Sequence, residues 1–194
     1  MKALLSIIFL TATTLLFGQE PAVITYADID DFAWDLFEGR INKKHLHEMG
    51  HNTGAVTVSS LSYTILQTSP KHARITITAR FHPEESWTKY PHLKDEKDAL
   101  RHEKGHLDIT EIYARRIRKI VADVQFSADN FKGELKQLFQ KVAKDHSNEQ
   151  IKYDRETNHS INKEEQLKWD AWIVGQLESL SPYTVPEIEL HLQE

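Results

Sequence analysis

The chain has 194 residues, a net charge of −5 at pH 7 with acidic and basic residues interspersed, and no cysteine. This balance excludes a basic field that would hold nucleic acid or anionic lipid, and the cysteine count excludes disulfides and a cysteine-linked lipid anchor. The histidine content is unusual, at 11 residues, and this composition favours nitrogen and oxygen ligands for any bound metal.

The N-terminal residues have the layout of a secretory signal peptide. Lys2 precedes an uncharged apolar run, residues 3–17, which breaks at Gly18. The run is shorter than the roughly 20 residues of a membrane-spanning helix, so we expect cleavage after Gly18 and no stable membrane anchor afterwards. Residues 1–18 are therefore the predicted leader, and residues 19–194 form a single domain of a secreted or periplasmic protein.

The first half of the mature chain predicts strands. Residues 22–26 form a short apolar stretch, and an irregular connection follows over residues 30–52. Residues 56–66 partly alternate apolar side chains with Ser and Thr, and turn residues follow. Residues 73–81 alternate cleanly, with the two-residue period of a strand that has one solvent-facing side. We expect an antiparallel hairpin whose second strand is available to pair with an extended substrate.

The second half predicts three helices. Helical patterns cover residues 95–123 and residues 128–144. A third helix begins at Asn162, whose side chain is expected to cap the free amides while Glu165 completes a capping box, and it ends at Ser181-Pro182. The polar sequence just before the third helix is interpreted as a connecting segment.

The first of these helices carries His102-Glu103-Lys104-Gly105-His106, a match to the H-E-x-x-H motif. Residues four apart lie one turn above each other, so both imidazoles can reach one zinc ion, and Glu103 points beside it as a general base. The alternative is a pair of core histidines, which would need two separate sets of hydrogen-bond partners. Gly105 costs about 1 kcal/mol inside a helix, and close approach of another backbone, or the site itself, would account for it.

A second H-E-x-x-H string, residues 47–51, is interpreted as a coincidence in a loop. Its histidines share a helix face with Arg40, Lys43 and Lys44, which would repel a cation, and residues 52–54 would stop a helix at once. A periplasmic zinc scavenger that uses this histidine-rich tract remains an alternative, and it predicts more than one zinc ion per chain.

A catalytic zinc takes three protein ligands and leaves one position for water. The polar segment Tyr153–Ser160 is the best source of the third ligand, and His159 is the first choice. Asp154 is the second candidate, as a metal ligand or as a residue that holds a ligand histidine. Tyr153 is a candidate hydrogen-bond donor to an oxyanion.

These residues resemble a family, the bacterial domain of unknown function 922, described as predicted secreted zinc-dependent proteases. The resemblance is strong in Leu100–Arg116 (LRHEKGHLDITEIYARR) and in Tyr153–Ser160 (YDRETNHS), and it is weak in Trp34–Gly39. It also includes Ser86-Trp87, Gln166 and Trp169, so it spans most of the mature chain. In the family the second block looks like Y-D-x-x-T-x-H-G, so Ser160 stands where the pattern has glycine. The resemblance implies a zincin-like peptidase and supplies no substrate.

We therefore predict an α+β, zincin-like fold: a small antiparallel sheet packed on the long motif helix, with two further helices. The predicted function is an enzyme, a secreted zinc metallopeptidase that hydrolyses a peptide or protein substrate with zinc-activated water and Glu103 as base. The alternative is a secreted, non-catalytic zinc-binding or interaction module. A site closed by four ligands, Asp154 and His159 together with the two motif histidines, would favour that alternative.

Overall fold

The computed structural model describes residues 22–41, 54–89 and 97–193. The predicted leader and the string at residues 47–51 lie outside this range. None of the helices in the described range is long and apolar enough to cross a membrane. The elements in chain order are β1 (Ile24–Thr25), η1 (Tyr26–Asp28), η2 (Trp34–Leu36), β2 (Ala55–Val56), β3 (Ser59–Ser69), β4 (His72–Phe81), β5 (Trp87–Thr88), α2 (Lys97–Asp123), α3 (Phe131–Thr157), α4 (Lys163–Ser179), η3 (Ser181–Tyr183) and β6 (Glu187–His191).

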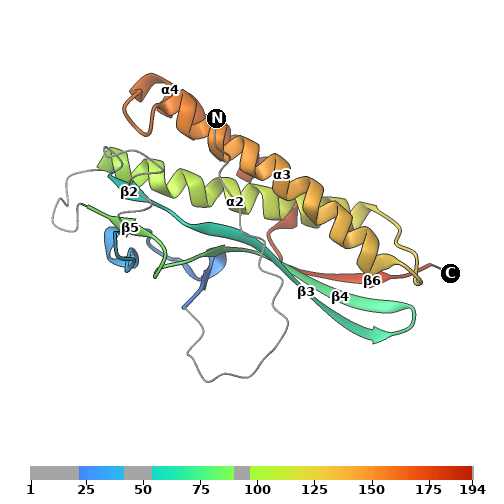
Figure 1. Ribbon diagram of the computed structural model, residues 1–194. Coiled ribbons are helices and arrows are strands. Elements are labelled where there is room, and N and C mark those ends of the chain that lie inside the picture. Colours follow the sequence, from blue (N-terminus) through green and yellow to red (C-terminus); the bar gives the residue numbers. More distant parts are fainter. Residues whose placement is uncertain (1–21, 42–53, 90–96, 194) are drawn as a thin grey trace.

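The α+β class, with a small antiparallel sheet and three helices, is confirmed (Figure 1). β3 and β4 form the predicted hairpin, although the strand expected at residues 56–66 is divided into β2 and β3. β6 pairs with β4 along residues 72–76, and β1 pairs with the other end of β4. The expectation that residues 73–81 accept an extended substrate is therefore wrong, because β4 has strand neighbours on both sides.

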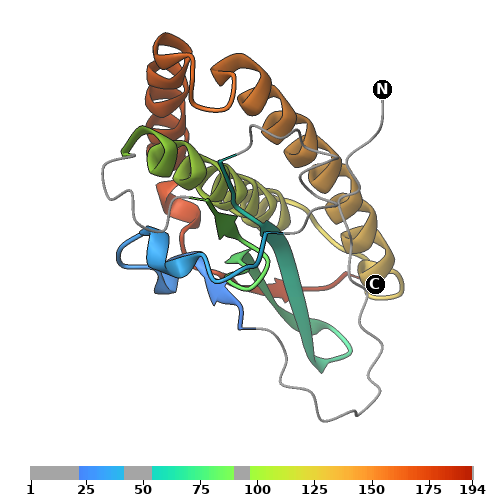
Figure 2. The same ribbon diagram turned by 60° about the vertical axis from the view of Figure 1, so that its left-hand side comes forward.

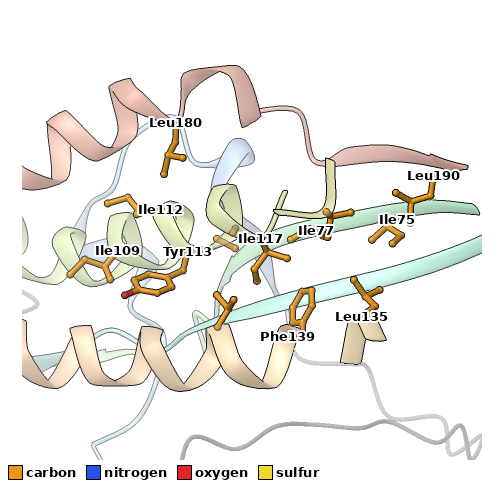
Figure 3. Packing of buried hydrophobic residues seen from close by; sticks show 14 of the residues in the cluster. Ile75, Ile77, Ile109, Ile112, Tyr113, Ile117, Leu135, Phe139, Leu180 and Leu190 are labelled. Carbon is orange, nitrogen blue, oxygen red and sulfur yellow. The ribbon is translucent and has the colours of Figure 1, made fainter. Parts of the chain in front are cut away.

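The core lies between the sheet and α2. Alternate residues of β4, including Ile75 and Ile77, are fully buried and face Ile112 and Ile117 of α2 (Figure 3). Each such aliphatic side chain contributes about 1.5–3 kcal/mol on burial. α3 and α4 flank the opposite side of α2, so this helix is enclosed by the sheet and two helices (Figure 1 and Figure 2). The polar residues of the motif are thus placed inside the domain.

The second helix is longer than predicted. It was expected to end near Lys144 and instead continues to Thr157, so Tyr153 and Asp154 lie on a helix and not in a connecting segment. The apolar stripe stops beyond Val142 because the side chains that face α2 from there on are polar and hydrogen-bonded to it. Hydrophobic periodicity therefore vanishes while the helix continues.

The start of the third helix agrees with the prediction in one half of its capping box. The Asn162 side chain accepts a hydrogen bond from the backbone N–H of Glu165 at 3.3 Å. The Glu165 carboxylate pairs with Lys168, and the backbone N–H of Asn162 donates to the Thr157 carbonyl at 2.8 Å. The reciprocal bond of a capping box is therefore replaced by a bond that ties α4 to the end of α3.

Candidate metal and active site

The motif residues lie on the N-terminal half of α2, on the side enclosed by α3 and α4. His102 and Glu103 are buried, and the His106 side chain is 14% exposed. The two imidazole rings lie edge to face with their centroids 4.9 Å apart. Their Nε2 atoms are 3.1 Å and 3.0 Å from the same atom, Oδ1 of Asp154. The spacing of four residues therefore does aim both rings at one point.

His159 reaches that point from the loop after α3. Its Nδ1 lies 3.3 Å from Asp154 Oδ1, so three imidazole nitrogens surround a single carboxylate oxygen. The ligand atoms of His102, Asp154 and His159 all lie within 4.8 Å of one another, and His106 joins them through Asp154. The His159 side chain is 66% exposed, which marks the solvent side of the site. All four predicted metal residues are brought together.

The carboxylate and the imidazoles perturb each other's pKa. Burial lowers the pKa of His106, but the charge and hydrogen bond of Asp154 outweigh it and raise that pKa to about 9. Burial raises the pKa of Asp154, yet the charge of His106 and the hydrogen bonds from the three imidazoles hold it far below its usual range. The hydrogen bond to Asp154 raises the pKa of His159. The site therefore stabilises positive charge where the nitrogens meet.

Glu103 supplies an unsatisfied group beside this cluster. Its Oε2 is buried and has no hydrogen-bond partner among the described residues. A buried carboxylate oxygen left in this way costs several kcal/mol unless an ion or a water satisfies it. The three histidines and Asp154 offer more than the three protein ligands that a catalytic zinc ion takes, and the unpartnered oxygen of Glu103 lies beside them.

Tyr153 has a different place from the one predicted. It is fully buried, its ring stacks on His102 with centroids 4.6 Å apart, and its hydroxyl donates to the His102 carbonyl at 3.1 Å. Burial raises the pKa of Tyr153, so the hydroxyl stays protonated and donates this bond. A methyl group at Gly105 would overlap the Tyr153 hydroxyl, which explains the helical glycine as expected. The predicted oxyanion contact finds no support in this placement, and Tyr153 instead positions the motif helix.

Two glutamines beside the site were missed as site residues from sequence. Gln166 Oε1 lies 3.1 Å from His102 Nδ1, and Gln150 Oε1 lies 2.5 Å from His106 Nδ1. Gln150 precedes Asp154 by one helical turn, so a helix drawn through to Thr157 would have placed both on the same face. For Gln166, the sequence feature that could have revealed it was its position in the helix that follows the YDRETNHS block.

The loop that carries His159 has an uncommon backbone. Asn158, His159 and Ser160 have φ values of 47°, 51° and 73°. A left-handed conformation costs an ordinary residue about 1–2 kcal/mol. The backbone N–H of His159 donates to the Asp154 carbonyl at 3.1 Å, and this bond turns the chain back over the end of α3. The strained turn is what directs the His159 ring toward Asp154.

We expect Ser160→Gly to raise the free energy of unfolding by about 0.5–1 kcal/mol, because glycine adopts φ 73° without strain at some entropic cost in the unfolded chain. Urea unfolding of the metal-free protein measures the change. Ser147→Gly, inside α3, is the matched control and should lower the stability by about 0.5–1 kcal/mol. Equal destabilisation by both substitutions would contradict this explanation of the turn.

A family model described as "Bacterial protein of unknown function (DUF922)" matches residues 33–160. The matched range contains the motif on α2, the whole of α3 and His159. No curated protein and no solved structure matches the chain.

Proposed function

Because the chain belongs to the bacterial family of unknown function DUF922, we propose its function from its own side chains: a secreted, zinc-dependent metallopeptidase with a zincin-like fold. The observation that carries the proposal is the convergence of three imidazole nitrogens on one carboxylate oxygen, 3.0–3.3 Å away, beside a buried and unpartnered oxygen of Glu103. His102, His106 and His159 would hold the ion, with Asp154 as the alternative third ligand. The proposal that the protein is secreted rests on residues 1–18, which have the layout of a signal peptide.

The residues of the site have different roles in the proposed reaction. A bound zinc ion would supply a Lewis acid that makes water more acidic and polarises a carbonyl group. Glu103 accepts the proton of the attacking water and passes it to the amine that leaves when the peptide bond breaks, so the base is restored. The peptide or protein substrate approaches from the side on which His159 is exposed. Tyr153 and Gly105 keep the motif turn of α2 in place by close packing.

One observation favours a second candidate, a non-catalytic zinc-binding or interaction module. Asp154 stands between the three histidines, and a site in which all four residues bind the ion would be closed to water. The number of ligands therefore separates the two functions.

Metal analysis of the purified mature protein tests both candidates. We expect one zinc ion per chain in the wild type and none in His106→Ala, whereas His191→Ala, which removes an exposed histidine on β6, should keep the ion. If His159→Ala loses the ion and Asp154→Asn keeps it, the site has three ligands and room for water. If His159→Ala and Asp154→Asn both lose the ion and the wild type cleaves no peptide library, the non-catalytic module is favoured. More than one zinc ion per chain would support a scavenger. A metal-free wild type would rule out the peptidase, the scavenger and a zinc-binding module, and would leave only an interaction module without metal.

A further inference from the structure

Each motif histidine has a glutamine behind it, on the side of the ring away from Asp154. Gln150 of α3 contacts His106 Nδ1, and Gln166 of α4 contacts His102 Nδ1. Gln166 is fully buried. A side-chain amide can present its oxygen or its nitrogen to an imidazole, so its orientation decides which ring nitrogen carries the proton.

The orientation of Gln150 is decided by a backbone carbonyl. Its Nε2 lies 2.9 Å from the carbonyl oxygen of His106, which can only accept a hydrogen bond. The amide oxygen must therefore face His106 Nδ1, at 2.5 Å. Because an amide oxygen only accepts, His106 Nδ1 carries a proton, and in the neutral ring that binds a metal it is the only ring nitrogen that does.

The same reasoning holds for Gln166 through two acceptors. Its Nε2 lies 2.8 Å from Asp170 Oδ1 and 2.8 Å from the hydroxyl of Tyr153. The Tyr153 hydroxyl donates its proton to the His102 carbonyl, so its oxygen accepts the hydrogen bond from Gln166. The Gln166 oxygen is left to face His102 Nδ1 at 3.1 Å, and this nitrogen is again the donor.

We propose that Gln150 and Gln166 are positioning residues that hold His106 and His102 in the Nδ1–H tautomer, so that both Nε2 lone pairs are aimed at one shared cation. The inference rests on the proposed zinc site and adds to it the groups that orient the ligands. Metal-bound histidines generally donate their other N–H to such a partner. Here both partners are neutral amides, which set the tautomer without a carboxylate in direct contact with Nδ1 of either ring.

This tautomer makes the cluster incompatible with neutral histidines alone. Two Nε2 lone pairs would face Asp154 Oδ1 at 3.1 Å and 3.0 Å, and lone pairs at that distance repel unless positive charge lies between them. Protons added to both Nε2 atoms would let them donate to Asp154, but they would create two imidazolium rings with centroids 4.9 Å apart. One divalent cation satisfies both nitrogens and the carboxylate at once.

The zinc affinity of glutamine variants tests the inference. Competition with a chromophoric chelator should give zinc dissociation constants about 10–100-fold weaker for Gln150→Leu and Gln166→Leu than for the wild type. Gln176→Leu is the matched control on α4, since the Gln176 amide accepts from Arg116 away from the site, and its affinity should equal that of the wild type. Urea unfolding of each metal-free variant separates a loss of affinity from a loss of fold.

A spectroscopic readout needs no variant. In zinc-loaded wild type labelled with ¹⁵N-histidine, long-range proton–nitrogen correlation spectra should show His102 and His106 protonated at Nδ1. Protons on Nε2, or unchanged zinc affinity in both leucine variants, would overturn the roles of the glutamines while leaving the zinc site intact. A wild type that binds no zinc would instead overturn the site itself.

Discussion

Glu103→Gln should lower peptide hydrolysis by about 10²–10⁴-fold while the protein keeps its zinc ion. The substitution preserves the shape of a side chain that is buried beside the histidine cluster, and it removes the oxygen that accepts the proton. Glu103 is not one of the groups that converge on Asp154 Oδ1, so the zinc content should not change. Turnover of a peptide library by zinc-loaded protein, with metal content measured on the same sample, checks both parts.

The stability of this variant gives a further check. A neutral amide at position 103 removes a buried carboxylate oxygen that has no hydrogen-bond partner in the described structure, so the metal-free variant should be at least as stable as the wild type. Glu164→Gln, an exposed carboxylate paired with Lys168 on α4, is the matched control and should leave hydrolysis unchanged. Equal turnover by Glu103→Gln and wild type would mean that Glu103 is not the base.

Arg118→Met should destabilise the protein by about 3–5 kcal/mol. Arg118 is 3% exposed, and its guanidinium donates to the Ile77 carbonyl at 2.8 Å and to the Glu111 carboxylate at 3.0 Å. It also donates to the carbonyls of Tyr183 and Thr184, at 2.9 Å and 3.2 Å. One side chain thus joins α2, β4 and the segment before β6, and its loss leaves buried acceptors and part of a buried charge unpaired.

Urea unfolding of the metal-free protein measures this loss. Arg74→Met is the matched control, because Arg74 pairs with Glu189 at 2.6 Å on the exposed face of the sheet, where a salt bridge contributes at most about 1 kcal/mol. Arg115 lies 2.9 Å from Glu111 and remains as its partner in the variant, so the cost should fall toward the lower end of the range. A change of less than about 1 kcal/mol in Arg118→Met would show that the network is not needed for stability.

Local patterns in the sequence were enough to predict α2, the β3–β4 hairpin and the start of α4. The alternation of residues 73–81 and the cap at Asn162 depend on neighbours a few positions away, so both can be recognised in the sequence alone. The extent of α3 was not predictable in this way. Its last turns present polar side chains to α2, and their partners become known only when the helices are packed.

The sequence by itself determined that His102, Glu103 and His106 share one helical turn, since that depends only on 3.6 residues per turn. It also singled out Asp154 and His159 as candidates. Only the tertiary structure decided that they meet the motif, that Tyr153 packs on Gly105, and that Gln150 and Gln166 stand behind the rings. These contacts join residues 44–64 positions apart, and such pairs leave no periodic trace along the chain.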